Sequence, residues 1–275
     1  MRPRMRVVVW LLLAVAAVGC AGMPDPHLIR TEVGKYAVVT AGQGTPALVL
    51  EANLGNGSAV WAPLFDDLAQ TTRVLGYDRA GNGGSMARSN DRSAAQIVRE
   101  LHSLLEVAGI GPPYVLVSHS LGNRYVELFA RTYPNEVAGV VFLDGLYQDY
   151  VLACFPMSNP AAEFCPASSV MRETFDAVPN AGDKEYNSLR NASEQLRMAG
   201  PFPAVPVAVV SGTRLMTGGN ADRDWLEEQQ RLLKLSPRGR QIVCKDCGYA
   251  VQYDNPGLVV RTIREIVAES RVAKN

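Results

Sequence analysis

The segment Tyr114–Gly122 constrains the fold more than any other part of the chain. Its apolar start, Tyr-Val-Leu-Val, runs into Ser-His-Ser-Leu-Gly, and helical periodicity begins directly afterwards. A strand that turns sharply into a helix holds the central serine in a strained backbone conformation, with its hydroxyl clear of the sheet. We therefore interpret Ser120 as a candidate nucleophile. Gly122 meets the need for a small residue beside the turn, whereas Ser118 stands where glycine is usual.

Length and charge favour a single domain with a small ligand. A chain of 275 residues that is 47% hydrophobic suits one large α/β domain with an ample core. Lys plus Arg and Asp plus Glu both total 27, so the chain has no net charge that would attract nucleic acid. We expect a small, neutral ligand and no nucleic-acid partner.

Residues 1–20 have the pattern of a targeting leader. Three arginines precede an apolar stretch, Val7–Val18, which is shorter than the roughly 20 residues that span a bilayer. The stretch ends in Ala-Val-Gly-Cys, which resembles a bacterial lipoprotein processing site with Cys20 as the lipidated residue. We expect an exported protein in the cell envelope, lipid-anchored to the membrane outside the cytoplasm. An ordinary secretory signal and an uncleaved anchor are the alternatives, and residues 21–275 form the domain itself.

The four remaining cysteines indicate disulfides, because export places them in an oxidising compartment. The most economical pairing joins Cys154 to Cys165 and Cys244 to Cys247. A four-cysteine zinc site is an alternative, although the second close pair expected of such a site is missing. A redox role for the C-x-x-C pair is another alternative. We expect no cofactor and no metal.

Apolar runs alternate with helical patterns along the rest of the chain. Such alternation predicts an α/β fold, with a mostly parallel central sheet covered by helices on both faces and ligands at the carboxyl ends of the strands. Residues 28–41 predict a hairpin that leads into the sheet. Strand-like runs lie at 47–50, 74–77, 114–117, 138–143, 205–211 and 240–244, and helical patterns at 93–109, 121–129, 224–235 and 256–267.

Residues 146–203 have a different composition from the predicted core. Six prolines and two cysteines interrupt this segment, which contains only short helical stretches. It lies between two predicted strands. We interpret it as an inserted cap rather than a second domain.

Several ordered motifs make residues 28–271 resemble the α/β-hydrolase family. They are Leu50–Gly55, Tyr77–Ser85, Ser118–Gly122 and Tyr133–Gly139, the last leading to Asp144. The resemblance implies an α/β-hydrolase fold with a cap and an ester or acyl hydrolase activity. We therefore expect the small neutral ligand to be ester-like or otherwise apolar. It also implies that Ser120 is the nucleophile and that the backbone amides of Leu121 and Leu54 form an oxyanion hole. In this chain Ala-Asn replaces the usual His-Gly before Leu54.

The acid of the implied triad has more than one candidate. Asp144 ends its predicted strand at the catalytic edge, and we favour it. The aspartate that usually follows the 205–211 strand is absent. Asp222 and Asp224 come later, where they can also cap the following helix.

The base is the point at which the chain departs from the family pattern. The histidine position, seven residues before Pro256, holds Tyr249, and no histidine follows His119. Tyrosine has a reference pKa of about 10 and stays protonated where imidazole, near 6.5, can accept the serine proton. Two other histidines are alternatives for the base. His119 is adjacent to Ser120, although neighbouring residues on such a turn point in different directions, and His27 could reach the site only by an unusual excursion of the N-terminal segment. Two hypotheses stay open: a serine hydrolase with impaired activity, and a pseudoenzyme that binds a small ligand or a protein partner.

Overall fold

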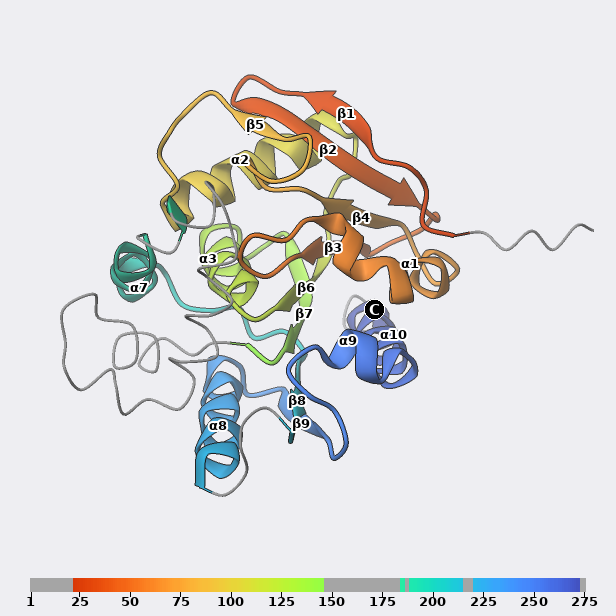
Figure 1. Cartoon of the computed structure of the whole chain (residues 1–275), viewed down its shortest axis with the longest axis vertical. Helices are drawn as coiled ribbons and strands as arrows, with labels where there is room; N and C mark the ends of the chain where they lie inside the picture. The colour runs from red at the N-terminus through yellow and green to blue at the C-terminus, as the bar shows by residue number, and fades with distance from the viewer. Residues whose placement is uncertain (1–21, 146–183, 186–187, 215–219, 273–275) are drawn as a thin grey trace, which may run out of the picture.

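A single twisted sheet organises the molecule (Figure 1). The computed structural model describes residues 22–145, 184–185, 188–214 and 220–272. Within these residues the strands are β1 (His27–Arg30), β2 (Gly34–Ala41), β3 (Ala47–Glu51), β4 (Val74–Tyr77), β5 (Met86–Ala87), β6 (Tyr114–His119), β7 (Val137–Leu143), β8 (Val207–Gly212) and β9 (Gly239–Cys244). Their order across the sheet is β1-β2-β4-β3-β6-β7-β8-β9, with β5 paired to β2.

The direction of the strands follows from their connections. β1 and β2 form the predicted antiparallel hairpin, and β2 also pairs antiparallel with β4. All the pairs from β4 to β9 are parallel, because helical segments connect these strands. The predicted α/β fold with a mostly parallel sheet is therefore confirmed.

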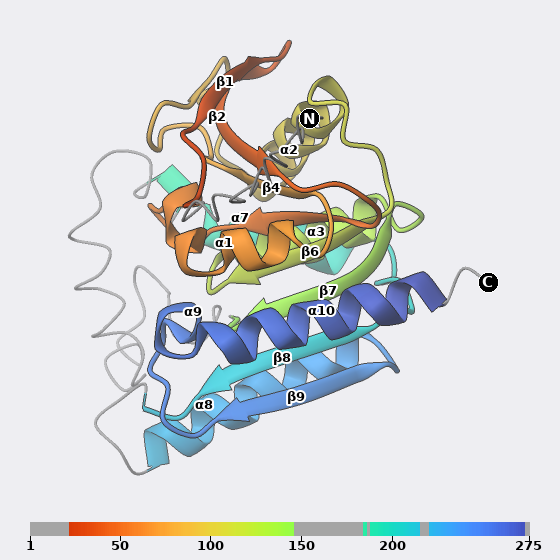
Figure 2. The same ribbon diagram turned by 90° about the vertical axis from the view of Figure 1, so that its right-hand side faces the viewer.

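Helices cover both faces of the sheet (Figure 2). They are η1 (Ser58–Trp61), α1 (Ala62–Ala69), α2 (Ala94–Val107), α3 (Gly122–Thr132), α7 (Leu189–Met198), α8 (Asn220–Arg231), η3 (Leu232–Leu235), α9 (Val251–Asp254) and α10 (Pro256–Val272). α2, α3, α7 and η3 pack on one face, and α1, α9 and α10 pack on the other. The central strands are buried on both sides, which explains their continuous apolar runs.

Two helices begin where the sequence predicts. The Ser93 hydroxyl accepts a hydrogen bond from the Gln96 backbone N–H at the start of α2. The Asn255 side chain accepts one from the Leu258 backbone N–H at the start of α10. Each side chain satisfies a donor that the first helical turn leaves without a partner.

Only part of the predicted cap is described, namely residues 184–185 and 188–203. α7, which belongs to this part, buries Ala192 and Leu196 in the core beside α2 and α3. Among the described residues, no helix combines the length and the apolar character that crossing a membrane requires.

Candidate active site

Ser120 occupies a strained turn between β6 and α3. Its φ is +53°, a left-handed conformation that side chains rarely adopt and that costs about 1–3 kcal/mol. Two backbone hydrogen bonds hold the turn: the Ser120 N–H donates to the Leu143 carbonyl at 3.0 Å, and the Asn123 N–H donates to the Ser120 carbonyl at 3.1 Å. The turn places Ser120 at the carboxyl edge of the sheet.

Gly122 lets this turn approach the loop that follows β3. A Cβ on Gly122 would lie 2.6 Å from the Ala52 carbonyl oxygen and 2.8 Å from that of Glu51. Both distances are too short for any side chain, so glycine is a steric requirement here. The two loops meet because β3 and β6 are parallel neighbours, with Glu51 opposite Ser118.

The backbone amides predicted for the oxyanion hole lie on these two loops. Leu121 precedes α3, and Leu54 follows the loop at Ala52. Within the described part of the chain, neither amide donates a hydrogen bond to another residue. Both N–H groups therefore remain available for a developing oxyanion.

Ser118 replaces the usual glycine with a buried hydroxyl. The residue is fully buried, and its Oγ has no hydrogen-bond partner among the described residues. A buried hydroxyl without a partner costs about 1–3 kcal/mol. The departure from the family pattern at this position thus reduces stability.

Replacing Ser118 with alanine is therefore expected to stabilise the protein by about 1 kcal/mol. The control is Ser58→Ala, because the Ser58 hydroxyl donates to Asp78 at 2.9 Å and its removal should destabilise by about the same amount. Urea unfolding measures both changes. Equal destabilisation by the two substitutions would contradict the assignment of an unpaired hydroxyl at Ser118.

Tyr249 contacts the candidate nucleophile directly. Its hydroxyl donates a hydrogen bond to the Ser120 Oγ. Burial raises the pKa of Tyr249 above its ordinary value of 10, the bond to Ser120 lowers it somewhat, and the charge of Asp144 raises it further. Tyr249 is consequently protonated at neutral pH, and its hydroxyl is in direct contact with Ser120.

His119 supports Tyr249 and does not contact Ser120 Oγ. Its Nε2 lies 2.9 Å from the Tyr249 backbone carbonyl, which can only accept, so Nε2 carries the proton. Its Nδ1 faces the Gln252 side-chain nitrogen at 3.4 Å, and burial lowers the pKa of His119 to about 4. The imidazole is neutral, and both of its nitrogens are engaged away from the serine hydroxyl.

His27 is far from the site in the sheet. It begins the outer strand β1, and β2, β4 and β3 separate that strand from β6. His27 therefore lies away from Ser120 in this structure.

Asp144 lies beside Tyr249 at the end of β7, with a φ of +42°. Its carboxylate accepts hydrogen bonds from the Trp225 indole nitrogen at 3.0 Å and from the Gly212 backbone N–H at 3.1 Å. Burial raises the pKa of Asp144 to about 8, although both hydrogen bonds lower it. The other predicted acids, Asp222 and Asp224, fall within α8, and their side chains lie outside the described ones.

The raised pKa of Asp144 predicts a pH-dependent stability. An aspartate has a pKa of about 3.9 when unfolded, so between about pH 4 and the folded value of about 8 the folded chain binds the extra proton. The free energy of unfolding should fall as the pH rises through this range, by up to about 1.4 kcal/mol per unit from this group. Asp144→Asn should remove that slope in urea unfolding between pH 5 and 8. Parallel pH profiles for the two proteins would contradict a raised pKa at Asp144.

A disulfide fixes the loop that carries Tyr249. It joins Cys244, at the end of β9, to Cys247. The Cys247 carbonyl also accepts hydrogen bonds from the backbone N–H groups of Thr213 and Arg214, at 3.0 and 2.9 Å. Cys20, Cys154 and Cys165 lie outside the described residues. Among the residues that are described, no group of three metal-ligating side chains comes together.

The structure adds residues that the sequence analysis did not single out. Trp225 holds Asp144, and a buried cluster of Arg79, Glu51 and Glu185 lies next to the loop before Leu54. Arg79 stands within one of the family motifs, but no sequence signal pairs it with Glu185, which is 106 residues away. Trp225 and Asp144 are similarly separated, by 81 residues.

Comparisons with known proteins agree with the fold. The sequence pattern described as the Alpha/beta hydrolase family matches residues 44–262. YqjL of Bacillus subtilis, an uncharacterized protein, is 28% identical over 225 residues, which cover 82% of this chain and 85% of YqjL. The enol-lactonase of Burkholderia xenovorans has a similar structure, with a TM-score of 0.64 at 18% identity over 88% of this chain and 100% of the lactonase. Cfl2 of Burkholderia cenocepacia gives a TM-score of 0.66 at 16% identity over 88% and 95% of the two chains.

Proposed function

Because this chain belongs to the alpha/beta hydrolase family, we propose that it is a serine hydrolase of low turnover that acts on small neutral esters or related acyl compounds. The observation that carries the proposal is the placement of Ser120. Its strained turn presents the hydroxyl to the Tyr249 hydroxyl at the sheet edge, and the N–H groups of Leu121 and Leu54 on the two adjoining loops donate to no other described residue. This arrangement supports attack on an acyl carbon and stabilisation of the resulting oxyanion.

The proposed reaction proceeds through an acylated serine. The Ser120 Oγ bonds to the acyl carbon and its proton passes by way of the Tyr249 hydroxyl to the leaving alkoxide, which departs as an alcohol. The N–H groups of Leu121 and Leu54 stabilise the tetrahedral oxyanion. Water then attacks the acyl carbon, releases the carboxylic acid and returns a proton to Ser120. Because burial raises its pKa, the Tyr249 hydroxyl keeps its own proton at neutral pH and is rarely present as the phenolate that could accept the serine proton, so proton transfer limits the rate.

The charge around Ser120 favours a neutral substrate. Asp144 and Glu51 are both buried near the two loops that carry the site, and the chain has no net charge. Glu51 pairs with Arg79, and burial raises the pKa of Asp144 to about 8, so near neutral pH neither group offers a free charge to an ionic substrate in this region of low dielectric. A neutral ester needs no such partner.

Ligand binding without catalysis is the second candidate function. The Tyr249 hydroxyl donates a hydrogen bond to Ser120 Oγ, and no imidazole of the described residues contacts that atom. Loss of a triad member typically costs on the order of 10⁴–10⁶ in rate. A protein with such a loss can retain its pocket for binding alone.

Ester turnover distinguishes the two functions. We expect slow hydrolysis of p-nitrophenyl butyrate by the natural protein and none above the solvent background by Ser120→Ala. The Ser120-dependent rate should rise with pH through pH 7–10 without a plateau, because the pKa of Tyr249 lies above its ordinary value. Identical rates for the two proteins would overturn the hydrolase proposal and favour the binding function.

We also propose export and lipid attachment at Cys20. The Cys244–Cys247 disulfide supports this, because such bonds persist in oxidising compartments. Mass spectrometry of protein extracted from membranes should find a lipidated Cys20 as the first residue. An unmodified N-terminus upstream of Cys20 would contradict the proposal.

A further inference from the structure

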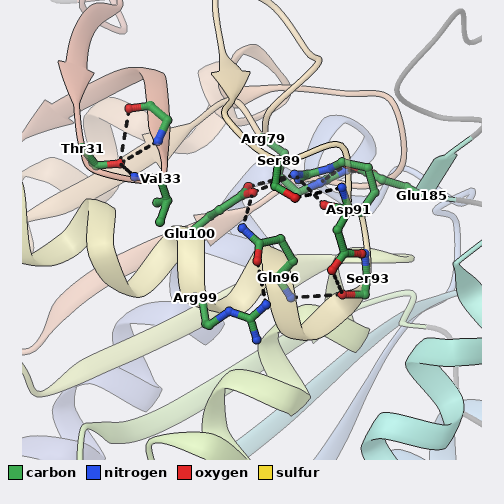
Figure 3. A network of polar contacts seen from close by, with 12 residues as sticks. Thr31, Val33, Arg79, Ser89, Asp91, Ser93, Gln96, Arg99, Glu100 and Glu185 are labelled. Atoms are coloured by element: carbon green, nitrogen blue, oxygen red, sulfur yellow. Dashed lines mark hydrogen bonds and ion pairs between the residues drawn. The ribbon is translucent and has the colours of Figure 1, made fainter.

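Arg79 lies in a buried cluster between the sheet edge and the described part of the cap. Its Nη1 pairs with Glu51 at 2.5 Å, and its Nε and Nη2 donate to Glu185 at 3.0 and 2.8 Å. The Arg79 side chain is 2% exposed, and those of both glutamates are fully buried. Figure 3 shows Arg79 reaching toward Glu185. Each ionic partner comes from a different region, Glu51 from the end of β3 and Glu185 from the cap.

The same guanidinium also holds the backbone of the oxyanion loop. Arg79 Nη1 donates to the Ala52 carbonyl at 2.7 Å, and Nη2 donates to the Asn53 carbonyl at 2.8 Å. The Asn53 carbonyl and the Leu54 N–H belong to one planar peptide unit, in which a trans bond makes them point in opposite directions. Fixing that carbonyl therefore fixes the direction of the Leu54 N–H.

We infer that Arg79 is a positioning residue for the oxyanion donor at Leu54 and that Glu185 holds it in place. Nη2 connects the two roles, because this one nitrogen bonds both Glu185 and the Asn53 carbonyl. The described cap thus contributes to the geometry of the oxyanion hole through the ion pair between Glu185 and Arg79. The inference rests on the proposed function. It adds that stabilisation of the transition state depends on a residue of the cap.

Glu185→Gln tests the inference with a matched control. Glu100→Gln also neutralises a buried partner of an arginine, since Arg92 pairs with Glu100 at 2.9 Å and their side chains are 5% and 3% exposed. Figure 3 shows Glu100 on α2. No hydrogen bond joins Arg92 or Glu100 to the described loop residues 52–54. The control therefore reproduces the loss of a buried ion pair without the proposed effect on Leu54.

The probe is butylboronic acid, which bonds to a serine oxygen and places a negatively charged tetrahedral group in an oxyanion hole. Complete loss of one oxyanion donor typically costs about 10²–10³ in kcat, so partial misplacement in Glu185→Gln should weaken boronate binding about 10- to 100-fold. The kcat for p-nitrophenyl butyrate should fall in parallel, with KM changed less than twofold. Glu100→Gln should keep boronate binding within twofold of the natural protein.

Arg79→Lys provides a second route to the same result. Lysine keeps the positive charge between the glutamates, but one ammonium cannot reproduce the planar fork that reaches both carbonyls. The same selective loss of boronate binding and kcat would support the inference. Unchanged boronate binding in folded Glu185→Gln or Arg79→Lys would overturn it, as would equal weakening in Glu100→Gln. Failure of the natural protein to bind the boronate would instead overturn the proposed function, and the inference with it.

Discussion

Replacing Tyr249 with histidine is expected to raise ester hydrolysis about 10²- to 10⁴-fold, the usual contribution of general acid–base catalysis. Tyr249 already contacts Ser120, so position 249 faces the nucleophile. Imidazole has a reference pKa of about 6.5 and can accept the serine proton and return it to the leaving group. The charge of Asp144 raises the pKa of Tyr249, and hydrogen bonds from Trp225 and Gly212 hold the Asp144 side chain. The imidazolium that forms during the reaction would favour the ionised form of Asp144, and that carboxylate would in turn stabilise the imidazolium.

The measurement is kcat/KM for p-nitrophenyl butyrate. Tyr253→His is the matched control, because Tyr253 lies four residues farther along and is 51% exposed. This control should leave kcat/KM unchanged. The activity of Tyr249→His should also reach a plateau above the histidine pKa, unlike that of the natural protein. A folded Tyr249→His protein with no gain in kcat/KM would show that residue 249 is not the base position.

Replacing Arg79 with methionine should reduce the free energy of unfolding by about 3–5 kcal/mol at pH 8. The substitution leaves Glu51 and Glu185 buried without their cation, and breaking a buried pair on one side typically costs that amount. Burial already raises the pKa of Glu51 although Arg79 lowers it, so loss of Arg79 favours the protonated carboxyl further. Protonation removes the unpaired charge, and the loss of stability should be smaller at pH 5 than at pH 8.

Urea unfolding at the two pH values measures this difference. Arg264→Met is the control, because Arg264 pairs with Asp67 at the surface, where the side chains are 43% and 58% exposed. Exposed pairs contribute about 0–1 kcal/mol, and we expect little change from the control at either pH. Equal losses for Arg79→Met and Arg264→Met would contradict a buried cluster at the oxyanion loop.

The arrangement of strands and helices could be predicted from local patterns. Apolar runs of strand length and the capping side chains Ser93 and Asn255 act over a few residues, so the sequence alone reveals them. The turn at Ser120 is equally local, because β6 leads directly into α3. These features were predicted at positions close to those observed.

Long-range partnerships in the site could not be predicted in the same way. Arg79 and Glu185 meet only because the chain returns from the cap to the sheet edge, 106 residues later. Trp225 lies in α8, which follows β8 in the sequence, and its indole nitrogen bonds back to Asp144. The hydrogen bond that turns His119 away from Ser120 joins it to the Tyr249 carbonyl, 130 residues later. Each of these contacts depends on tertiary packing rather than on residue spacing.

The most direct test of the central claim is covalent labelling of Ser120. The natural protein should react with a fluorophosphonate, and mass spectrometry should find the phosphonyl group on the peptide that contains Ser120. Labelling should be slow in the natural protein, faster in Tyr249→His and absent in Ser120→Ala. Absence of label on Ser120 in both the natural protein and a folded Tyr249→His variant would contradict the claim that Ser120 is a nucleophile.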